Sequence, residues 1–164
     1  MPVSVLVVNA SPLILLSKID ALSLLKAVGS RWCVPEAVVR EIEVKGQRDP
    51  VATTMTAATW LERVSVAAIP PEVSAWNLDD GEASVVAFAL SLPAAITLLD
   101  DRAGRNCARA MKLQVMGTAG LLLAARSKGL IPAVEPILRK LVAAGMYLSP
   151  QAATEILKRA GEER

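Results

Sequence analysis

The sequence predicts an α/β fold in which a parallel, doubly wound sheet precedes a wholly helical C-terminal part. Short apolar runs rich in β-branched residues alternate with segments of helical periodicity as far as Gly117. Of all residues, 53% are hydrophobic but only 3% aromatic, so aliphatic side chains must build the core, as in parallel sheets buried on both faces. The length of 164 residues suits a single domain over residues 1–164.

The first expected unit is a strand followed by a helix. Val3–Val8 is a short apolar run stopped by Asn9, which is typical of a buried strand. Ser11 is a favoured N-cap residue and Pro12 a favoured first helical residue. We therefore expect a helix to begin at this pair.

The next part of the chain continues the alternation with weaker signals. Gly29 closes a short helical segment, and Pro35 ends a brief strand. Gln47–Pro50 breaks the pattern, and the prolines of Ile69–Pro71 indicate a linker. The expected elements are a helix at 20–28, a strand at 32–34, a helix from 35 through 42, a helix at 51–62 and a strand at 64–67.

The strongest helix signal begins at Asp79. This acid suits the cap position, and Glu82 follows three residues later, as in a capping box. Beyond that helix we expect a strand at 96–99, a helix at 102–111, a strand at 113–116, and helices at 121–125, 132–143 and 150–160. Strands that alternate with helices in this way predict a parallel sheet.

The residue inventory excludes several kinds of chemistry. The chain has no histidine, which removes Ser-His-Asp and Cys-His catalysis. Cys33 and Cys107 cannot form a zinc site by themselves. No Gly-x-Gly-x-x-Gly follows the first strand and no P-loop lysine is present, which disfavours a Rossmann-type nucleotide-binding domain. Carboxylates and hydroxyls must therefore carry any reaction.

Charge is segregated along the chain. Residues 1–101 carry 7 Lys and Arg against 12 Asp and Glu, whereas residues 102–164 carry 11 against 4. Acidic groups can hold cations and basic groups attract a phosphate backbone. Solvated helix faces explain the same counts equally well.

The N-terminus lacks the basic region of a signal peptide, and no uncharged apolar run approaches the roughly 18 residues that span a bilayer. We therefore expect a cytoplasmic protein. The apolar content and the helical C-terminus suggest a homodimer.

Several oxygen-bearing side chains are expected at one edge of the sheet, because functional groups in open parallel sheets gather beyond the carboxyl ends of the strands. Taken singly, each has a structural explanation, such as helix capping or an exposed helix face. Together, several acids would repel one another unless a cation lay between them. The residues concerned are Asn9, Ser11, Asp100 and Asp101 after strands, Glu82 in the first turn of a helix, and Glu41 if its helix is suitably tilted.

Mg²⁺ or Mn²⁺ fits such a site best, because hard cations prefer oxygen ligands and need only one or two carboxylates besides waters and a substrate phosphate. Such an ion lowers the pKa of a bound water and stabilises charge on phosphate oxygens. Phosphodiester hydrolysis is the natural reaction.

These residues stand in motifs that together resemble the PIN-domain family, and within it the VapC-like prokaryotic branch. The resemblance covers nearly the whole chain and implies a PIN-like three-layer α/β/α sandwich, a metal-dependent ribonuclease site and, often, a toxin paired with a small antitoxin protein. The motifs are Val8-Asn9-Ala10-Ser11-Pro12-Leu13-Ile14, Val34-Pro35 with Glu41, Asp80-Gly81-Glu82-Ala83, and Leu99-Asp100-Asp101-Arg102 followed by Gly117-Thr118.

The resemblance also implies roles for individual residues. Asn9 takes the place of the first acid, Glu41 of the second and Glu82 of the third, while either Asp100 or Asp101 takes that of the fourth. Ser11 matches a hydroxyl residue that supports the first position. The candidates for holding RNA phosphates lie just after the acids and are Arg102, Arg105, Arg109 and Lys112.

Asn9 departs from the family pattern, which usually has aspartate at this position. Asparagine keeps a carbonyl oxygen for a metal but lacks the negative charge, so metal affinity should be weaker. Two hypotheses follow. The first is a Mg²⁺- or Mn²⁺-dependent endoribonuclease, the toxin of a toxin-antitoxin pair; the second is a catalytically weakened PIN module that binds RNA or a protein partner without cleavage.

Overall fold

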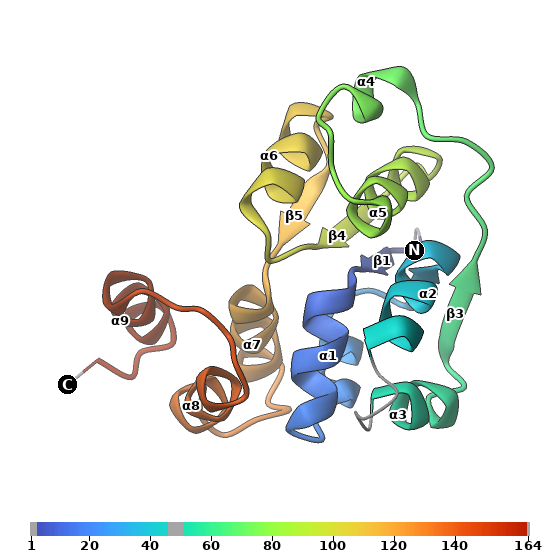
Figure 1. The fold of residues 1–164 in the computed structure, drawn as a ribbon. Helices are drawn as coiled ribbons and strands as arrows, with labels where there is room; N and C mark the ends of the chain where they lie inside the picture. The colour runs from blue at the N-terminus through green and yellow to red at the C-terminus, as the bar shows by residue number, and fades with distance from the viewer. Residues whose placement is uncertain (1–2, 46–50, 164) are drawn as a thin grey trace.

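Five parallel strands form the centre of the fold in the order β3-β2-β1-β4-β5 (Figure 1). A computed structural model describes residues 3–45 and 51–163, so the expected break at Gln47–Pro50 lies outside the described residues. Val5 pairs with Arg31 on one side and with Ala95 on the other, which makes β1 the central strand. The strands are β1 Val5–Val8, β2 Arg31–Pro35, β3 Leu61–Val64, β4 Ala95–Leu98 and β5 Gln114–Met116.

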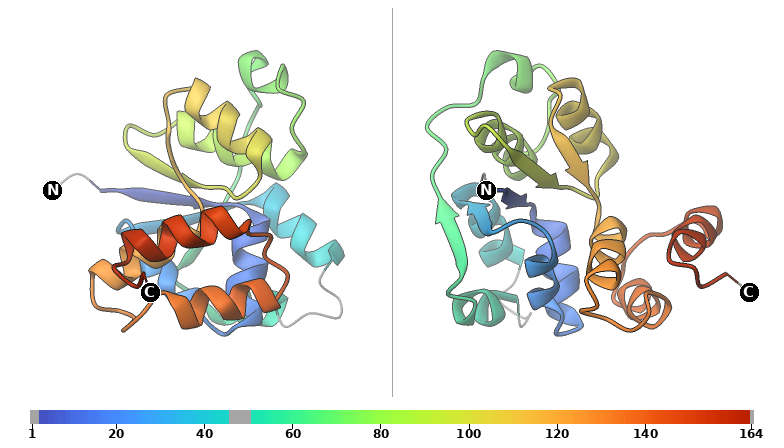
Figure 2. Two further views of the ribbon diagram at one scale, coloured as in Figure 1. Left: turned by 90° about the vertical axis from the view of Figure 1, so that its left-hand side faces the viewer. Right: turned by 180° about the vertical axis from the view of Figure 1, so that it is seen from behind.

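Helices cover both faces of this sheet, which confirms the predicted α/β/α sandwich with a parallel sheet (Figures 1 and 2). Helices α5 and α6 lie on one face, and α1, α3 and α7 on the other. The helices are α1 Ala10–Lys18, the 3-10 helix η1 Leu22–Ala27, α2 Glu36–Lys45, α3 Val51–Ala57, α4 Pro71–Ser74, α5 Asp80–Leu90, α6 Arg102–Ala110, α7 Thr118–Ser127, α8 Glu135–Ala143 and α9 Pro150–Arg159.

The core is built around β1 and α5. All four residues of β1 are buried, as expected for a central strand covered on both faces. Helix α5 is buried at nearly every position from Gly81 to Ala89, because it packs against the sheet and also contacts α2, α4 and α6. A helix enclosed in this way is rigid, and its first turn is therefore a firm base for a functional side chain.

The expected boundaries differ from the structure at several places. Helix α1 begins at Ala10 with Asn9 at the N-cap, so the expectation that Ser11 caps this helix is wrong. The helix expected over 51–62 ends at Ala57, and the strand expected at 64–67 is β3 at 61–64. β3 is an edge strand with exposed charged residues at its centre, so it lacks the apolar run by which the other strands can be recognised. The short helix α4 lies where the sequence indicated a linker.

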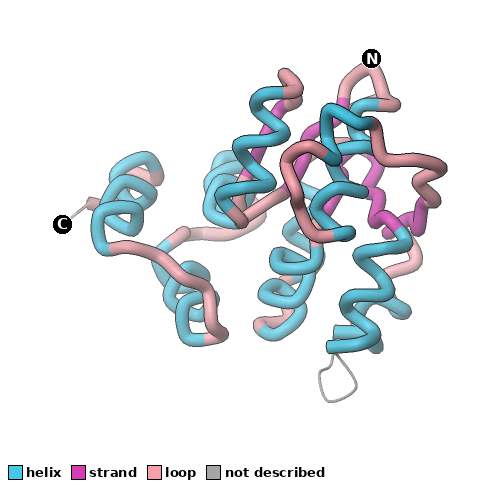
Figure 3. Tube along the Cα trace, turned by 45° about the horizontal axis from the view of Figure 1, so that its top comes forward, coloured by secondary structure: helices cyan, strands magenta, loops and turns pink. Residues whose placement is uncertain are grey.

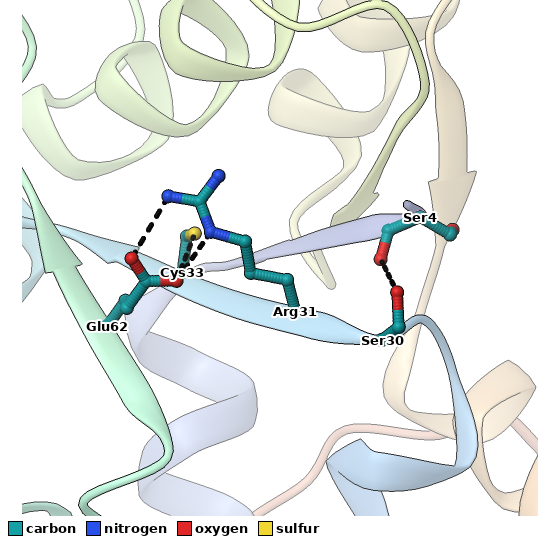
Figure 4. A network of polar contacts seen from close by, with 5 residues as sticks. All are labelled: Ser4, Ser30, Arg31, Cys33 and Glu62. Carbon is teal, nitrogen blue, oxygen red and sulfur yellow. Dashed lines mark hydrogen bonds and ion pairs between the residues drawn. The ribbon is translucent and has the colours of Figure 1, made fainter. Parts of the chain in front are cut away.

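An ion pair joins β3 to β2 near the start of β2 (Figure 4). The guanidinium of Arg31 donates to both carboxylate oxygens of Glu62, at 2.5 Å from Nε and 3.0 Å from Nη2. Cys33 lies on the same face, with its sulfur 4.0 Å from Glu62 Oε2. Both charged side chains are over two-fifths exposed, so the pair adds little stability.

The last two helices lie outside the sandwich, beside α7 (Figure 3). No residue of α9 is buried within this described helix, although Ile156 and Leu157 pack half-buried against the core. None of the helices in the described ranges has the length and apolar character needed to cross a membrane.

Candidate active site

The site lies where the chain connections diverge at the carboxyl edge of the sheet. β1 and β4 are neighbours, but the chain runs from β1 to β2 through α1 and from β4 to β5 through α6, which lie on opposite faces. A crevice forms at such a switch point. Asn9 follows β1 directly, and its backbone N–H donates to Leu98 O of β4 at 3.2 Å. Asp100 lies two residues beyond the end of β4. The side chains of Asn9 and Asp100 therefore enter the same crevice.

A groove of about 1110 Å³ passes over this edge. It is lined by every residue that the sequence suggested as a metal ligand or its support: Asn9, Ser11, Glu41, Glu82, Asp100 and Asp101. The structure therefore brings together side chains from four separate parts of the chain. Basic side chains line the same groove, namely Lys18, Lys45, Arg102 and Arg105.

Asn9 presents an unsatisfied oxygen to the crevice. The residue is only 5% exposed, and its Oδ1 has no hydrogen-bond partner among the described residues. A buried carbonyl oxygen without a partner is destabilising and is uncommon in native proteins. A cation or a water molecule in the crevice would satisfy it.

Three glycines make room for the carboxylates. A Cβ on Gly81 would lie 2.7 Å from Glu41 Oε2 and 3.5 Å from Asn9 Oδ1. A Cβ on Gly104 would lie 3.4 Å from the carboxyl carbon of Glu82. At Gly117 it would overlap the guanidinium of Arg105 and lie 3.2 Å from Asp100 Oδ1. The absence of side chains at these positions therefore lets the acids approach one another. The sequence motifs included Gly81 and Gly117, but Gly104 stands in no motif.

Among the acids that line the groove, Glu82 has the most strongly shifted pKa. It occupies the first turn of α5, where its backbone N–H donates to the capping carboxylate of Asp79 at 2.8 Å, as the sequence predicted. Its own side chain is only 7% exposed. Burial, together with the charges of Asp79, Asp101 and Glu41 and a hydrogen bond to Asp101, raises the pKa of Glu82 to about 7. Near neutral pH this carboxyl group therefore holds a proton about half of the time.

The two aspartates after β4 have different contacts. Asp100 accepts hydrogen bonds from Thr118 through both oxygens, from the backbone N–H at 2.8 Å and from the hydroxyl at 2.5 Å. Asp101 caps α6 by accepting from the backbone N–H of Ala103 at 3.1 Å. Asp101 also contacts Glu82. Asp100 is thus oriented by the start of α7, whereas Asp101 caps α6 and contacts the buried Glu82.

Glu41 reaches the crevice because α2 packs against both α1 and α5. One of its oxygens, Oε1, accepts from Lys45 Nζ at 2.8 Å, one helical turn away. This hydrogen bond raises the pKa of Lys45. The expectation that Glu41 would point toward the acids is compatible with this geometry, but the sequence reasoning missed Lys45. The i, i+4 spacing of the two residues was the signal that could have revealed the pair.

The basic residues expected to bind RNA divide into two groups. Arg102 and Arg105 line the groove, and Arg105 Nη1 donates to Leu99 O at 3.3 Å, which fixes its guanidinium beside Asp100. Arg109 and Lys112 are exposed at the other end of α6 and are not among the described residues that line the groove. The sequence reasoning also missed Lys18 and Tyr147, since neither stands in a motif or at the end of a strand.

A family model described as a PIN domain matches residues 5–162, nearly the whole chain. The chain belongs to the PIN-domain family. A search of curated proteins gave no match. PIN domains are generally nucleases, and they typically use divalent metal ions. The crevice of this PIN domain, with acids from several elements beside basic side chains, is of the kind that such chemistry requires.

The oxygen atoms in the crevice of this PIN domain suit a cation that needs only a few protein ligands. Within residues 3–45 and 51–163, no three acidic or cysteine side chains form a metal-binding group by themselves. Mg²⁺ is commonly held by only one or two carboxylates, with waters and substrate phosphates completing the shell. The unpaired Asn9 oxygen beside Glu41, and the Glu82–Asp101 pair, offer oxygens of that kind. The residues present therefore fit a divalent metal ion that prefers oxygen ligands.

Proposed function

We propose that this PIN domain is a Mg²⁺- or Mn²⁺-dependent endoribonuclease that hydrolyses RNA phosphodiester bonds at the groove. The observation that carries the proposal is the buried, unpaired Oδ1 of Asn9, which faces the same space as Glu41 Oε2 around Gly81. An oxygen that has no hydrogen-bond donor and lies beside a carboxylate is stabilised best by a cation, because neither oxygen can donate a hydrogen bond to the other.

The described contacts suggest distinct roles for the acids. Asn9 and Glu41 would hold the cation from one side, and Glu82 with Asp101 from the other. Asp100, which Thr118 orients, would complete the site, as hydrogen-bonded carboxylates commonly do around metals. The bound ion would supply an activated water and charge stabilisation on the phosphate. Ser11, exposed on the first turn of α1, lines the groove close to Asn9 and is placed to support the ligand set.

Arg102 and Arg105 would bind the RNA backbone beside the acids. Arg109 and Lys112 would contribute only to a longer RNA that continues along α6. We further propose that the protein is cytoplasmic and forms a homodimer, and that it is the toxin of a toxin-antitoxin pair. These proposals are supported by the resemblance of the motifs to VapC-like proteins and by the apolar side chains exposed on the C-terminal helices, such as Val142.

A second candidate function is RNA binding without cleavage. Asn9 lacks the charge of an aspartate, and Lys45 already occupies one oxygen of Glu41. Both features reduce the attraction of the site for a divalent cation. A PIN module of this kind would retain the basic side chains that line the groove and would bind RNA or a protein partner.

Cleavage of RNA by the purified protein tests the two candidates. We expect Mn²⁺ or Mg²⁺ to support cleavage, EDTA to stop it, and Glu82→Gln and Asp100→Asn each to reduce it by at least about a hundredfold. Glu43→Gln is a matched control, because Glu43 is an exposed acid on α2 that does not line the groove. Cleavage that survives in both site variants would reject this site. Metal-independent RNA binding without any cleavage would favour the second candidate.

A further inference from the structure

The loop between α8 and α9 places an aromatic side chain in the same groove as the acids. Tyr147 is 91% exposed, and it is the only tyrosine in the chain. The loop passes beside α1 (Figure 2), and Tyr147 lines the groove together with Ile14 and Lys18 of that helix. An exposed aromatic ring in a groove that also holds the candidate catalytic acids invites a role in substrate binding.

The backbone of this loop is fixed, so the position of Tyr147 is imposed by the fold. Gly145 adopts a φ of +117° and its N–H donates to Val142 O at 3.1 Å. The N–H of Met146 donates to Leu141 O at 2.9 Å. On the other side, Ser149 caps α9 by accepting from the backbone N–H of Ala152 at 3.1 Å. The neighbours Met146 and Leu148 are half-buried against the core. Tyr147 alone points outward from a loop that is anchored at both ends.

Positive charge accompanies this ring along the groove. Lys18, Arg102 and Arg105 line the same groove, on the helices that follow β1 and β4. Grooves that combine basic side chains with exposed aromatic rings are typical of proteins that bind single-stranded nucleic acid, because phosphates contact the cations and unpaired bases stack on the rings. In a duplex the bases are already stacked inside the helix, so Tyr147 could not contact a base face.

We propose that Tyr147 stacks against an unpaired base of single-stranded RNA whose phosphates lie along Lys18, Arg102 and Arg105. This inference rests on the proposed function, because it assigns a substrate-binding residue to the same groove. It adds that the α8–α9 loop supplies a base-binding side chain to that groove. A second protein on this face would be the other occupant, but four basic and six acidic side chains line the groove, and the centre of a protein interface is depleted of charge.

Binding measured without cleavage tests the inference. A short fluorescein-labelled single-stranded RNA, and the same sequence annealed to its complement, are titrated with protein in EDTA and followed by fluorescence anisotropy. We expect Tyr147→Ala to weaken binding of the single strand by about 5-fold to 100-fold. Tyr147→Phe should stay within about twofold of the parent protein, since a phenyl ring also stacks. Binding of the duplex should be unaffected by either substitution.

Trp76→Ala provides a matched aromatic control, because it also removes an exposed ring. Trp76 is 40% exposed at the end of α4 and is not among the described residues that line the groove, so its substitution should leave RNA binding unchanged. Circular dichroism and thermal melting establish that each variant is folded. Analytical ultracentrifugation of Tyr147→Ala shows whether the ring belongs to a contact between copies of the chain.

The outcomes separate this inference from the proposed function. Tyr147-dependent binding of single-stranded RNA by a protein that does not cleave would support the inference and reject the nuclease. Cleavage with unaltered RNA binding in a folded Tyr147→Ala variant would overturn the inference and leave the nuclease standing. The inference is also overturned if the parent protein binds neither RNA. A Tyr147→Ala variant that loses self-association while it keeps its RNA affinity would overturn it equally, because the ring would then belong to a protein contact.

Discussion

The buried carboxyl group of Glu82 should make the metal-free protein less stable as the pH rises through neutrality. The pKa of Glu82 is about 7 in the folded protein, against 4.5 for an ordinary glutamate. The folded state therefore retains a proton that the unfolded chain has already lost. This contribution to stability is fully present below pH 4.5, and it is lost as the pH rises to 7 and above.

The two pKa values set the size of the effect. A difference of 2.5 pH units corresponds to about 3 kcal/mol between the acid and alkaline limits. About 2 kcal/mol of this falls between pH 5.5 and 7.5 by the same linkage relation. Glu82 is 7% exposed, so solvent screens the effect little. The full change would lower the melting temperature of a chain of this size by roughly 6–12 °C.

The composition leaves few other groups that titrate in the pH range of this measurement. The chain has no histidine, so no other side chain of ordinary pKa titrates between pH 5.5 and 7.5. The α-amino group does titrate near this window, but it is shared by all variants and cancels in comparisons. Urea unfolding, followed by circular dichroism in EDTA at constant ionic strength, gives the free energy of unfolding at each pH.

Glu82→Gln should flatten the pH profile and should be more stable than the parent protein at pH 7.5, because the amide cannot ionise. Glu43→Gln, which alters an exposed acid outside the groove lining, should keep the parent slope. Parallel profiles for the parent protein and Glu82→Gln would refute the reasoning, since the slope would then arise elsewhere. A slope of opposite sign would refute it as well.

Three further substitutions test the contacts around the acids. Lys45→Met removes the ion pair with Glu41 and should tighten Mn²⁺ binding by up to about fivefold in isothermal titration calorimetry; unchanged affinity would show that the pair does not compete with the metal. Thr118→Val leaves Asp100 without its hydroxyl donor and should lower the free energy of unfolding by about 1–3 kcal/mol, whereas Thr118→Ser should keep most of it. Asn9→Asp places a negative charge beside Glu41 at a position that is only 5% exposed, so it should destabilise the metal-free protein. Mn²⁺ should then raise the melting temperature of this variant by more than it raises that of the parent protein. An equal Mn²⁺ response in both proteins would show that Asn9 does not contact the ion.

The strands that build the centre of the sheet could be predicted because burial on both faces leaves a local signal. β1 is a near-continuous apolar run, and β4 ends at the acids where the sequence placed its end to within one residue. β3 was misplaced because it lies at the edge of the sheet, where Glu62 and Arg63 are exposed. Its position is fixed by pairing with Trp32–Pro35, which is a tertiary contact that periodicity does not encode.

The sequence could also predict part of the site. Asn9 and Asp100 follow adjacent parallel strands, so a general rule of α/β folds places them together. The reach of Glu41 depends on how α2 packs between α1 and α5, so the sequence alone could place Glu41 at this edge only on the condition that its helix is suitably tilted. Tyr147 could not be predicted, because the path of the α8–α9 loop past α1 arises from the packing of the last helices and leaves no local pattern.

The charge of the crevice, more than its shape, separates the two candidate functions. Asn9 removes one negative charge and Lys45 offsets another, while the raised pKa of Glu82 shows that desolvation and repulsion still oppose ionisation there. A cation that binds would have to displace the proton of Glu82, so binding at neutral pH should release protons. Asn9→Asp and Lys45→Met each increase the negative charge beside Glu41. If each raises Mn²⁺ affinity and cleavage together, charge limits the enzyme; if affinity rises without cleavage, the geometry of the acids suits a binding module instead.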